Sequence, residues 1–232
     1  MFHARWSWRI VGGVLVLAGL TGSASSARAQ LRIMPLGDSI TAGVGSPQLG
    51  GYRLPLWDAL QWFGWDAEFV GSQSDGPPRL GSKANEGHGG YRIDQIAAGV
   101  DQWLETYQPE VILLLIGTND CLQDYQFATV RQRMEDLIDR ILHRRPHAFL
   151  VVSTVLPLRD LEANARAVQI NEFLPAVVAA RWKRGHQIML VNMYAMLNPW
   201  EDMPDGIHPD PVGYAVMAAV WYDALLDILL FG

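Results

Sequence analysis

The chain has little of several features that would point to particular classes of protein. It contains a single cysteine, Cys121, in 232 residues, which excludes a disulfide framework and a zinc site built from cysteines. Only 18% of residues are charged and the formal net charge is −6, an acidic balance that argues against nucleic acid or an anionic membrane as the main partner. No uninterrupted apolar run reaches the roughly 18 residues of a membrane-spanning helix. Of all residues in the chain, 50% are apolar, which is enough for a sizeable core in one α/β domain or two small domains.

The first 29 residues have the pattern of a secretory signal peptide. Arg5 and Arg9 form a positively charged start, residues 10–20 form an apolar stretch, and residues 27–29 (Ala-Arg-Ala) form a cleavage site. A buried first helix or strand is the alternative, but the apolar run is short, contains glycine and is flanked by small residues. We therefore expect cleavage there, a secreted protein (extracellular or periplasmic), and a single folded domain over residues 30–232.

Beyond residue 30, apolar strand patterns alternate with helical ones. Residues 110–116 (EVILLLI) are apolar on both faces, as a central parallel strand must be. The other strands are expected at 31–36, 67–70, 147–155 and 186–191, and the helices at 54–63, 93–107, 130–143, 161–183 and 211–230. This alternation predicts a three-layer α/β/α sandwich with a five-stranded parallel sheet in the order 2-1-3-4-5. The Gly/Ser/Pro-rich stretch 71–90 has no periodicity and is expected to be a functional loop.

Four polar motifs lie at strand ends or just before helices. Ser39 follows the first strand in a Gly-Asp-Ser turn that can expose its hydroxyl, and Asn119 follows the central strand with an amide that can donate to an oxyanion. Gly90 ends the long loop, where a glycine lets its backbone N–H approach a ligand. Asp205 precedes His208 by three residues, so the carboxylate can accept the Nδ1–H and leave Nε2 free as a base.

Each motif alone is more typical of a turn, a helix cap, a loop end or a solvated histidine. Together they supply a nucleophile, two oxyanion donors, an orienting carboxylate and a base. In the sheet order 2-1-3-4-5 the first and third strands are neighbours at the switch point where ligands bind, so Ser39 and Asn119 are expected to face each other there. His88 is a weaker candidate, because its glycine loop shows no carboxylate spaced to orient it. The combination predicts acyl transfer through Ser39.

This set of residues closely resembles the SGNH (GDSL-type) hydrolases over essentially the whole chain after the leader. The resemblance implies a flavodoxin-like SGNH hydrolase fold and a single catalytic domain. It also implies a triad of Ser39, His208 and Asp205, and an oxyanion hole made by the N–H groups of Ser39 and Gly90 with the Asn119 side chain.

One branch of that family is more similar still. The segments IMPLGDSITAGVGS, NEGHGGYRID and VILLLIGTND look like carbohydrate esterase family 3, which contains secreted acetylxylan esterases. The second block departs from the branch, with Gly89 in place of a commoner serine and Tyr91 in place of a commoner tryptophan. The donor glycine is kept, so the departure bears on substrate fit.

The resemblance implies a secreted serine esterase that removes small acyl groups, acetyl above all, from plant polysaccharide such as xylan. Tyr91 and Trp200 are the candidate substrate contacts, and Tyr125 is a further residue of the rim. A thioesterase or lysophospholipase with the same machinery is the alternative, and a non-catalytic carbohydrate-binding protein on the same fold is a second one. No cofactor or metal is expected, since no His and carboxylate cluster has ligand spacing, although a calcium site of loop carbonyls stays open. We expect a monomer with no nucleic-acid partner and, once the leader is removed, no membrane partner.

Overall fold

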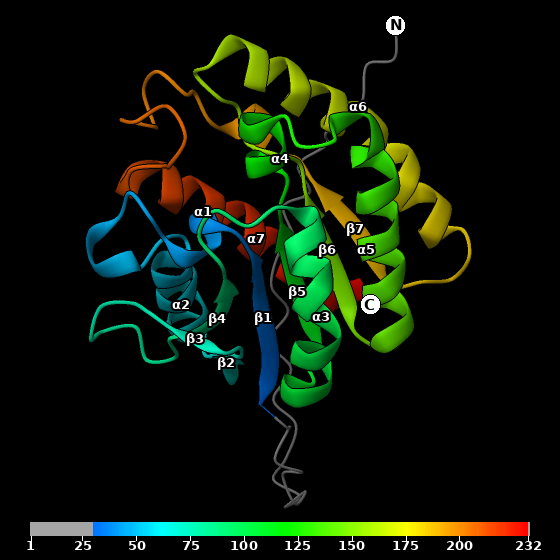
Figure 1. Cartoon of the computed structure of the whole chain (residues 1–232). Helices are drawn as coiled ribbons and strands as arrows, with labels where there is room; N and C mark the ends of the chain where they lie inside the picture. The colour runs from blue at the N-terminus through cyan, green and yellow to red at the C-terminus, as the bar shows by residue number, and fades with distance from the viewer. Residues whose placement is uncertain (1–29, 232) are drawn as a thin grey trace, which may run out of the picture.

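A mostly parallel β-sheet lies between two layers of helices in the computed structural model (Figure 1). The structure describes residues 30–231, so the expected signal peptide lies outside the described residues. The strands are β1 (Leu31–Gly37), β2 (Ala67–Phe69), β3 (Gln73–Ser74), β4 (Ala84–Gly87), β5 (Val111–Leu115), β6 (Phe149–Ser153) and β7 (Ile188–Val191). The expected fold class, a three-layer α/β/α sandwich, is confirmed.

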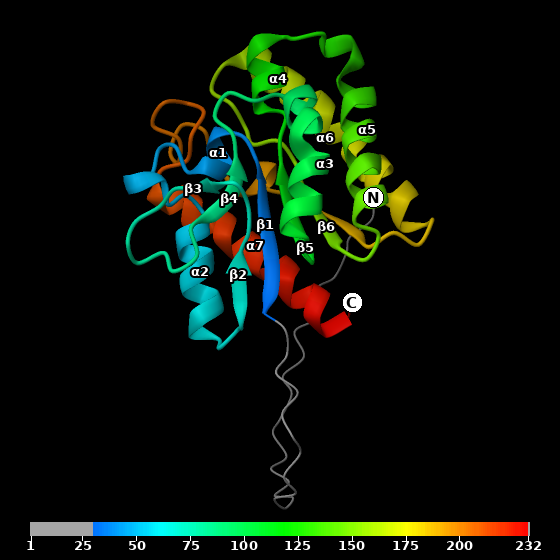
Figure 2. The ribbon, with the colours of Figure 1, turned by 60° about the horizontal axis from the view of Figure 1, so that its bottom comes forward.

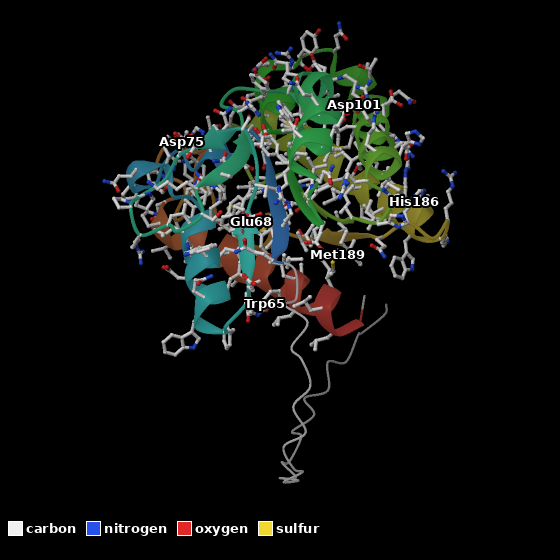
Figure 3. The ribbon with its side chains drawn as sticks, turned by 90° about the horizontal axis from the view of Figure 1, so that it is seen from below. Trp65, Glu68, Asp75, Asp101, His186 and Met189 are labelled. Carbon is white, nitrogen blue, oxygen red and sulfur yellow. The ribbon has the colours of Figure 1, made fainter. Side chains whose placement is uncertain are left out.

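The order of the sheet is β3-β4-β1-β5-β6-β7, and β2 also pairs with β1. The five expected strands are β2, β1, β5, β6 and β7, and they are neighbours in the predicted order. In Figure 3, Glu68 of β2 and Met189 of β7 lie to either side of β1, as this order requires. β1 and β5 run in register from Ile33↔Val111 to Gly37↔Leu115, so both strands end at the same edge of the sheet.

The expected number of strands was wrong, because the stretch 71–90 contains β3 and β4. β4 pairs in parallel with the end of β1, where Gly37 lies opposite Gly87. Its sequence, Ala-Asn-Glu-Gly, carries no apolar alternation, so only the hydrogen bonds to β1 define it as a strand. Gly87 also needs to lack a side chain, since a Cβ there would lie 2.3 Å from the backbone nitrogen of Ala42. This pairing ties the glycine-rich stretch to the strand that leads into Ser39.

The helices divide between the two faces of the sheet (Figure 2). They are α1 (Ser39–Ala42), α2 (Arg53–Trp62), α3 (Ile93–Tyr107), α4 (Thr118–Gln123), α5 (Val130–Arg144), α6 (Leu161–Trp182) and α7 (Pro211–Phe231), with 3-10 turns at Pro47–Leu49, Phe127–Thr129 and Tyr194–Met196. The buried side chains of α3, α5 and α6 pack with Ile112 and Leu114, and those of α2 and α7 pack with Leu113 and Leu115. β5 is apolar throughout because alternate residues enter two separate cores.

Helix α7 is long and apolar enough to cross a membrane by length and composition alone. Its side chains at Trp221, Ala224 and Leu225 are buried against the sheet and α2, and it also carries Asp223 and Asp227. A helix that buries one side in this way has the pattern of a core helix. Core helices can also be long and apolar enough to meet the criteria for a membrane span.

Candidate active site

Ser39 begins α1, two residues after the end of β1. The preceding Asp38 caps this short helix, since its Oδ1 accepts a hydrogen bond from the Ile40 N–H at 3.0 Å. Gly37 is required by packing, because a Cβ there would lie 2.0 Å from the carbonyl oxygen of Leu115. The close approach of β1 and β5 therefore requires glycine at position 37, and Ser39, which begins the next helix, lies at the carboxyl edge of the sheet.

Three of the predicted site residues form one hydrogen-bonded chain. Nε2 of His208 lies 2.9 Å from Oγ of Ser39, and Nδ1 of His208 lies 2.7 Å from Oδ2 of Asp205. These contacts bring together residues that are 169 positions apart in the sequence. The segment before α7 and helix α1 meet at the same end of the molecule (Figure 2). The arrangement lets His208 receive a proton from Ser39 while Asp205 fixes the orientation of the imidazole ring.

The Asp205 carboxylate is held in its charged form. Burial opposes ionisation, but hydrogen bonds from the His208 N–H at 2.7 Å, the His208 ring and the Ile207 N–H at 2.9 Å outweigh it and lower the pKa of Asp205 below its ordinary value. Asp205 is nevertheless 53% exposed and the His208 side chain is 16% exposed. The site therefore lies at the surface of the protein.

Arg159, in the loop between β6 and α6, holds the segment that carries Asp205. Its guanidinium donates to the carbonyl oxygens of Pro199 at 3.0 Å, Pro204 at 3.2 Å and Met203, and its backbone N–H donates to Gly206 at 3.0 Å. Four bonds from one residue fix a loop that has no regular structure of its own. Arg159 is a positioning residue that the sequence alone did not reveal.

The two remaining predicted donors follow β5 and β4, the strands that pair with β1 on either side. Asn119 is in the first turn of α4, which follows β5, and its Nδ2 donates to the carbonyl oxygen of Tyr91 at 3.0 Å. The same nitrogen lies 3.4 Å from Oδ2 of Asp38, a long and therefore weak contact. Gly90 adopts φ +81°, the left-handed region, with open space where a Cβ would be. Its backbone therefore has room for an approaching ligand.

His88 has an orienting carboxylate, which corrects the expectation from the sequence. Its Nε2 lies 2.8 Å from Oε2 of Glu86, a fully buried residue that also accepts from the backbone and hydroxyl of Ser72. The His88 ring stacks on Tyr91 and Trp103, with ring centroids 4.9 Å and 4.5 Å away. Glu86 and His88 are two residues apart, so in extended backbone both point to the same face. The spacing would have predicted the pair had β4 been assigned as a strand.

Asp38, directly before Ser39, is completely buried. The pKa of Asp38 is raised to about 7: burial is the main cause, the hydrogen bond from the Ile40 N–H opposes it, and the nearby Asp120 carboxylate adds to the rise. Asp120 is itself buried; it accepts from the Ile93 N–H at 3.0 Å and pairs with Arg133. Two buried carboxylates, Asp38 and Asp120, thus directly precede Ser39 and directly follow Asn119 in the chain.

Arg53 anchors the segment that follows Ser39. It is fully buried, and its guanidinium donates to the carbonyl oxygens of Thr41, Ala42, Leu49, Asp75 and Lys83. These bonds tie α1 to the stretch that leads into β4. Burial lowers the pKa of Arg53, and the five carbonyl dipoles compensate the charge.

The two predicted substrate contacts lie in different surroundings. The Tyr91 ring is half-buried and stacked on His88, so its contacts are mainly internal. Trp200 is 69% exposed, and the Arg159 guanidinium lies 5.1 Å from its ring centroid. Within residues 30–231, no group of His, Cys, Asp and Glu side chains is placed to hold a metal ion.

The fold and the groups gathered at this edge are those of the SGNH class of hydrolases. The model of the GDSL-like Lipase/Acylhydrolase family matches residues 36–216, so the chain belongs to that family.

The relatives of known structure include two carbohydrate esterases. The chain is 34% identical to a Clostridium thermocellum family 3 carbohydrate esterase, with a TM-score of 0.78 over 86% of this chain and 96% of that one. A family 3 carbohydrate esterase from Talaromyces cellulolyticus is 20% identical, with a TM-score of 0.75 over 86% of this chain and 98% of that one, and shares the fold. The resemblance to carbohydrate esterase family 3 inferred from the motifs is confirmed.

A curated relative extends beyond the length of this chain. The multidomain esterase of Ruminococcus flavefaciens is 28% identical over 230 residues, which cover 87% of this chain and 29% of that protein. A second curated relative, from Acetivibrio thermocellus, is 30% identical over 139 residues, which cover 59% of each protein. The chain thus spans less than two thirds of the length of either relative.

Proposed function

We propose that the protein is a secreted serine esterase that removes small acyl groups, acetyl above all, from plant polysaccharide such as xylan. The observation that carries the proposal is the chain of hydrogen bonds from Ser39 Oγ through His208 to Asp205, at 2.9 Å and 2.7 Å. Secretion follows from the leader pattern of residues 1–29.

The reaction proceeds in two acyl-transfer steps. His208 Nε2 takes the Ser39 proton while Oγ attacks the ester carbonyl, and the His208 cation then protonates the leaving alkoxide as the bond between carbonyl carbon and alcohol oxygen breaks. Water next gives a proton to His208 and attacks the acyl-serine, which releases the acid and restores Ser39. Asp205 stays ionised throughout and stabilises the cationic imidazole.

The oxyanion of each tetrahedral intermediate is bound by three donors, the backbone N–H groups of Ser39 and Gly90 and the Asn119 amide. The amide makes one firm bond, to Tyr91, and one long contact of 3.4 Å, to Asp38. A substrate oxyanion can replace the long contact at little cost. Removing one donor of this kind typically lowers kcat by about 10²–10³.

Two observations support a polysaccharide ester as substrate. The chain is similar along nearly its whole described length to a family 3 carbohydrate esterase. The site is also open, because Asp205 is half exposed at the surface, so that an acyl group carried on a long polymer can reach Ser39 without the polymer entering the protein.

The test compares wild type with Ser39→Ala on acetylated xylan, on 4-nitrophenyl esters from acetate to palmitate, and on an acyl-thioester. We expect wild type to release acetate from xylan and to prefer 4-nitrophenyl acetate, and the variant to lose both activities with an unchanged circular dichroism spectrum. Preference for long acyl chains or the thioester would support the lipolytic or thioesterase alternative. Xylan binding without Ser39-dependent turnover would support the binding protein.

A further inference from the structure

Beyond the catalytic groups, an exposed tyrosine lies on the oxyanion side of the site. We infer that the ring of Tyr125 is a binding platform for a neutral pyranose unit of the substrate chain, at a distance from the ester that is cleaved. This inference rests on the proposed function, since it assigns part of the same substrate to a second place on the surface.

Tyr125 is connected to the oxyanion donors through α4. Asn119 is in the first turn of this helix and Gln123 ends it, which separates the two by about 6 Å along the axis at 1.5 Å per residue. The Gln123 amide Nε2 lies 3.4 Å from the carbonyl oxygen of Gly90. The Tyr125 ring lies against Arg92, the residue after Tyr91, whose carbonyl oxygen accepts from Asn119, so the ring lies close to the segment that carries Gly90.

The backbone presents Tyr125 in a strained turn. Asp124 and Gln126, on either side of it, both have left-handed backbone conformations, with φ of 50° and 44°. Such conformations cost free energy in residues other than glycine and persist where the surroundings enforce them, often at binding sites. Here Arg133 donates to the Tyr125 carbonyl at 2.8 Å, and Arg166 pairs with Asp124 at 3.2 Å. The position of the tyrosine is therefore set before any ligand binds.

Two arginines lie against the ring, Arg92 closely and Arg133 with its guanidinium carbon 5.6 Å from the ring centroid. The Arg92 guanidinium carbon lies 4.0 Å from the ring centroid, and the same guanidinium donates to Asp94 at 3.0 Å and 3.1 Å and to Gln123 Oε1 at 2.7 Å. Tyr125 as a whole residue is still 37% exposed. An aromatic side chain that is fixed in this way loses little conformational entropy on binding.

The chemistry around the ring favours a neutral sugar over an anion. Arg92 is paired with Asp94 and Arg133 with Asp120, so the charges of the platform are balanced. A pyranose has an apolar C–H face that suits an aromatic ring, and its hydroxyl groups can reach the carboxylate, amide and guanidinium at the ring edge. Trp62, which is 85% exposed at the end of α2, is an exposed aromatic residue on a different element and serves as a control.

The kinetic test compares Tyr125→Ala, Tyr125→Phe and Trp62→Ala with wild type on acetylated xylan and on 4-nitrophenyl acetate. We expect Tyr125→Ala to lower kcat/KM on the polymer about tenfold, through KM, and to change 4-nitrophenyl acetate hydrolysis less than twofold. Tyr125→Phe and Trp62→Ala should resemble wild type on both substrates. An equal loss on both substrates, or no loss on the polymer, would overturn the inference.

Binding without turnover separates this inference from the proposed function. In a Ser39→Ala background, affinity for unacetylated xylo-oligosaccharides is measured by calorimetry with and without Tyr125→Ala. A tenfold weaker affinity with the tyrosine removed supports the platform, even if wild type fails to deacetylate xylan and the proposed function fails. Unchanged affinity, or no binding by the Ser39→Ala protein, rejects the platform while leaving the esterase activity a separate result.

Discussion

The imidazole of His88 is joined to the buried carboxylate of Glu86, with 2.8 Å between Nε2 and Oε2. His88 also donates its backbone N–H to the Gly37 carbonyl at 2.9 Å, at the end of β1. The two glycines that follow, Gly89 and Gly90, have no side chains to hold them in place. His88 is therefore the anchor of the loop that carries the Gly90 N–H.

Replacing this anchor should slow the reaction more than it weakens binding. We expect His88→Ala to lower kcat on 4-nitrophenyl acetate about tenfold, a part of the effect of losing an oxyanion donor, with KM within twofold of wild type. His147→Ala, at an exposed position, is the control and should change neither value. A rise in KM with unchanged kcat would show that His88 acts on binding instead.

The Asn119 side chain is expected to contribute only in the transition state. Asn119→Ala removes the amide and should lower kcat by about 10²–10³, which corresponds to about 3–4 kcal/mol of barrier, with a small change in KM. Steady-state kinetics on 4-nitrophenyl acetate measure this effect. Turnover close to that of wild type would remove Asn119 from the oxyanion hole.

Asp38 should make the stability of the fold depend on pH. Its pKa is raised by burial from 3.8 to about 7, so between these values the folded protein holds a proton that the unfolded chain has lost. This proton's contribution to the free energy of unfolding is fully present below about pH 4 and is lost as pH rises through about 7. Between these values the free energy of unfolding falls by up to about 1.4 kcal/mol per pH unit.

Urea unfolding of wild type and Asp38→Asn at a series of pH values isolates this contribution. Groups such as Asp205, whose lowered pKa gives the opposite sign, are present in both proteins and cancel in the difference. We expect the free energy of unfolding of wild type to fall relative to that of the variant between pH 4 and pH 7. Parallel curves would show that Asp38 is ionised throughout this range.

Arg159 should affect both stability and turnover. Arg159→Ala removes three guanidinium bonds from the carbonyl groups of residues 199–204, and charged donors contribute about 1.5–3 kcal/mol each when buried. Because the site is partly exposed, we expect a loss of about 2 kcal/mol in thermal or urea unfolding. We also expect kcat to fall severalfold as Asp205 loses its fixed position.

A second variant shows whether Arg159 acts through the loop. Arg159→Lys keeps the charge but lacks the planar fork that reaches several carbonyl oxygens, and should recover only part of kcat. Equal kcat in wild type and Arg159→Ala, measured well below the unfolding temperature, would limit the role of Arg159 to stability.

The strands and helices could largely be predicted from local patterns. β5 is recognisable because a strand with helices on both faces must be apolar at every position, and α3 begins and ends at the expected residues, Ile93 and Tyr107, because its apolar positions recur with helical spacing. β4 could not be predicted in the same way, because the hydrogen bonds that define it come from β1.

The sequence by itself determined which residues could do chemistry, because serine, asparagine, aspartate and histidine follow strand ends or precede a helix at short, recognisable spacings. The tertiary structure decided how these groups are held: Glu86 behind His88, Arg159 behind the segment of Asp205, and Arg92 behind Tyr125. Arg159 meets backbone carbonyl groups 40 to 45 positions away, Arg92 meets a ring far along the chain, and Glu86 faces His88 because pairing with β1 defines the strand β4. Backbone carbonyl groups are alike at every position and pairing partners come from distant segments, so only the fold shows which of them meet.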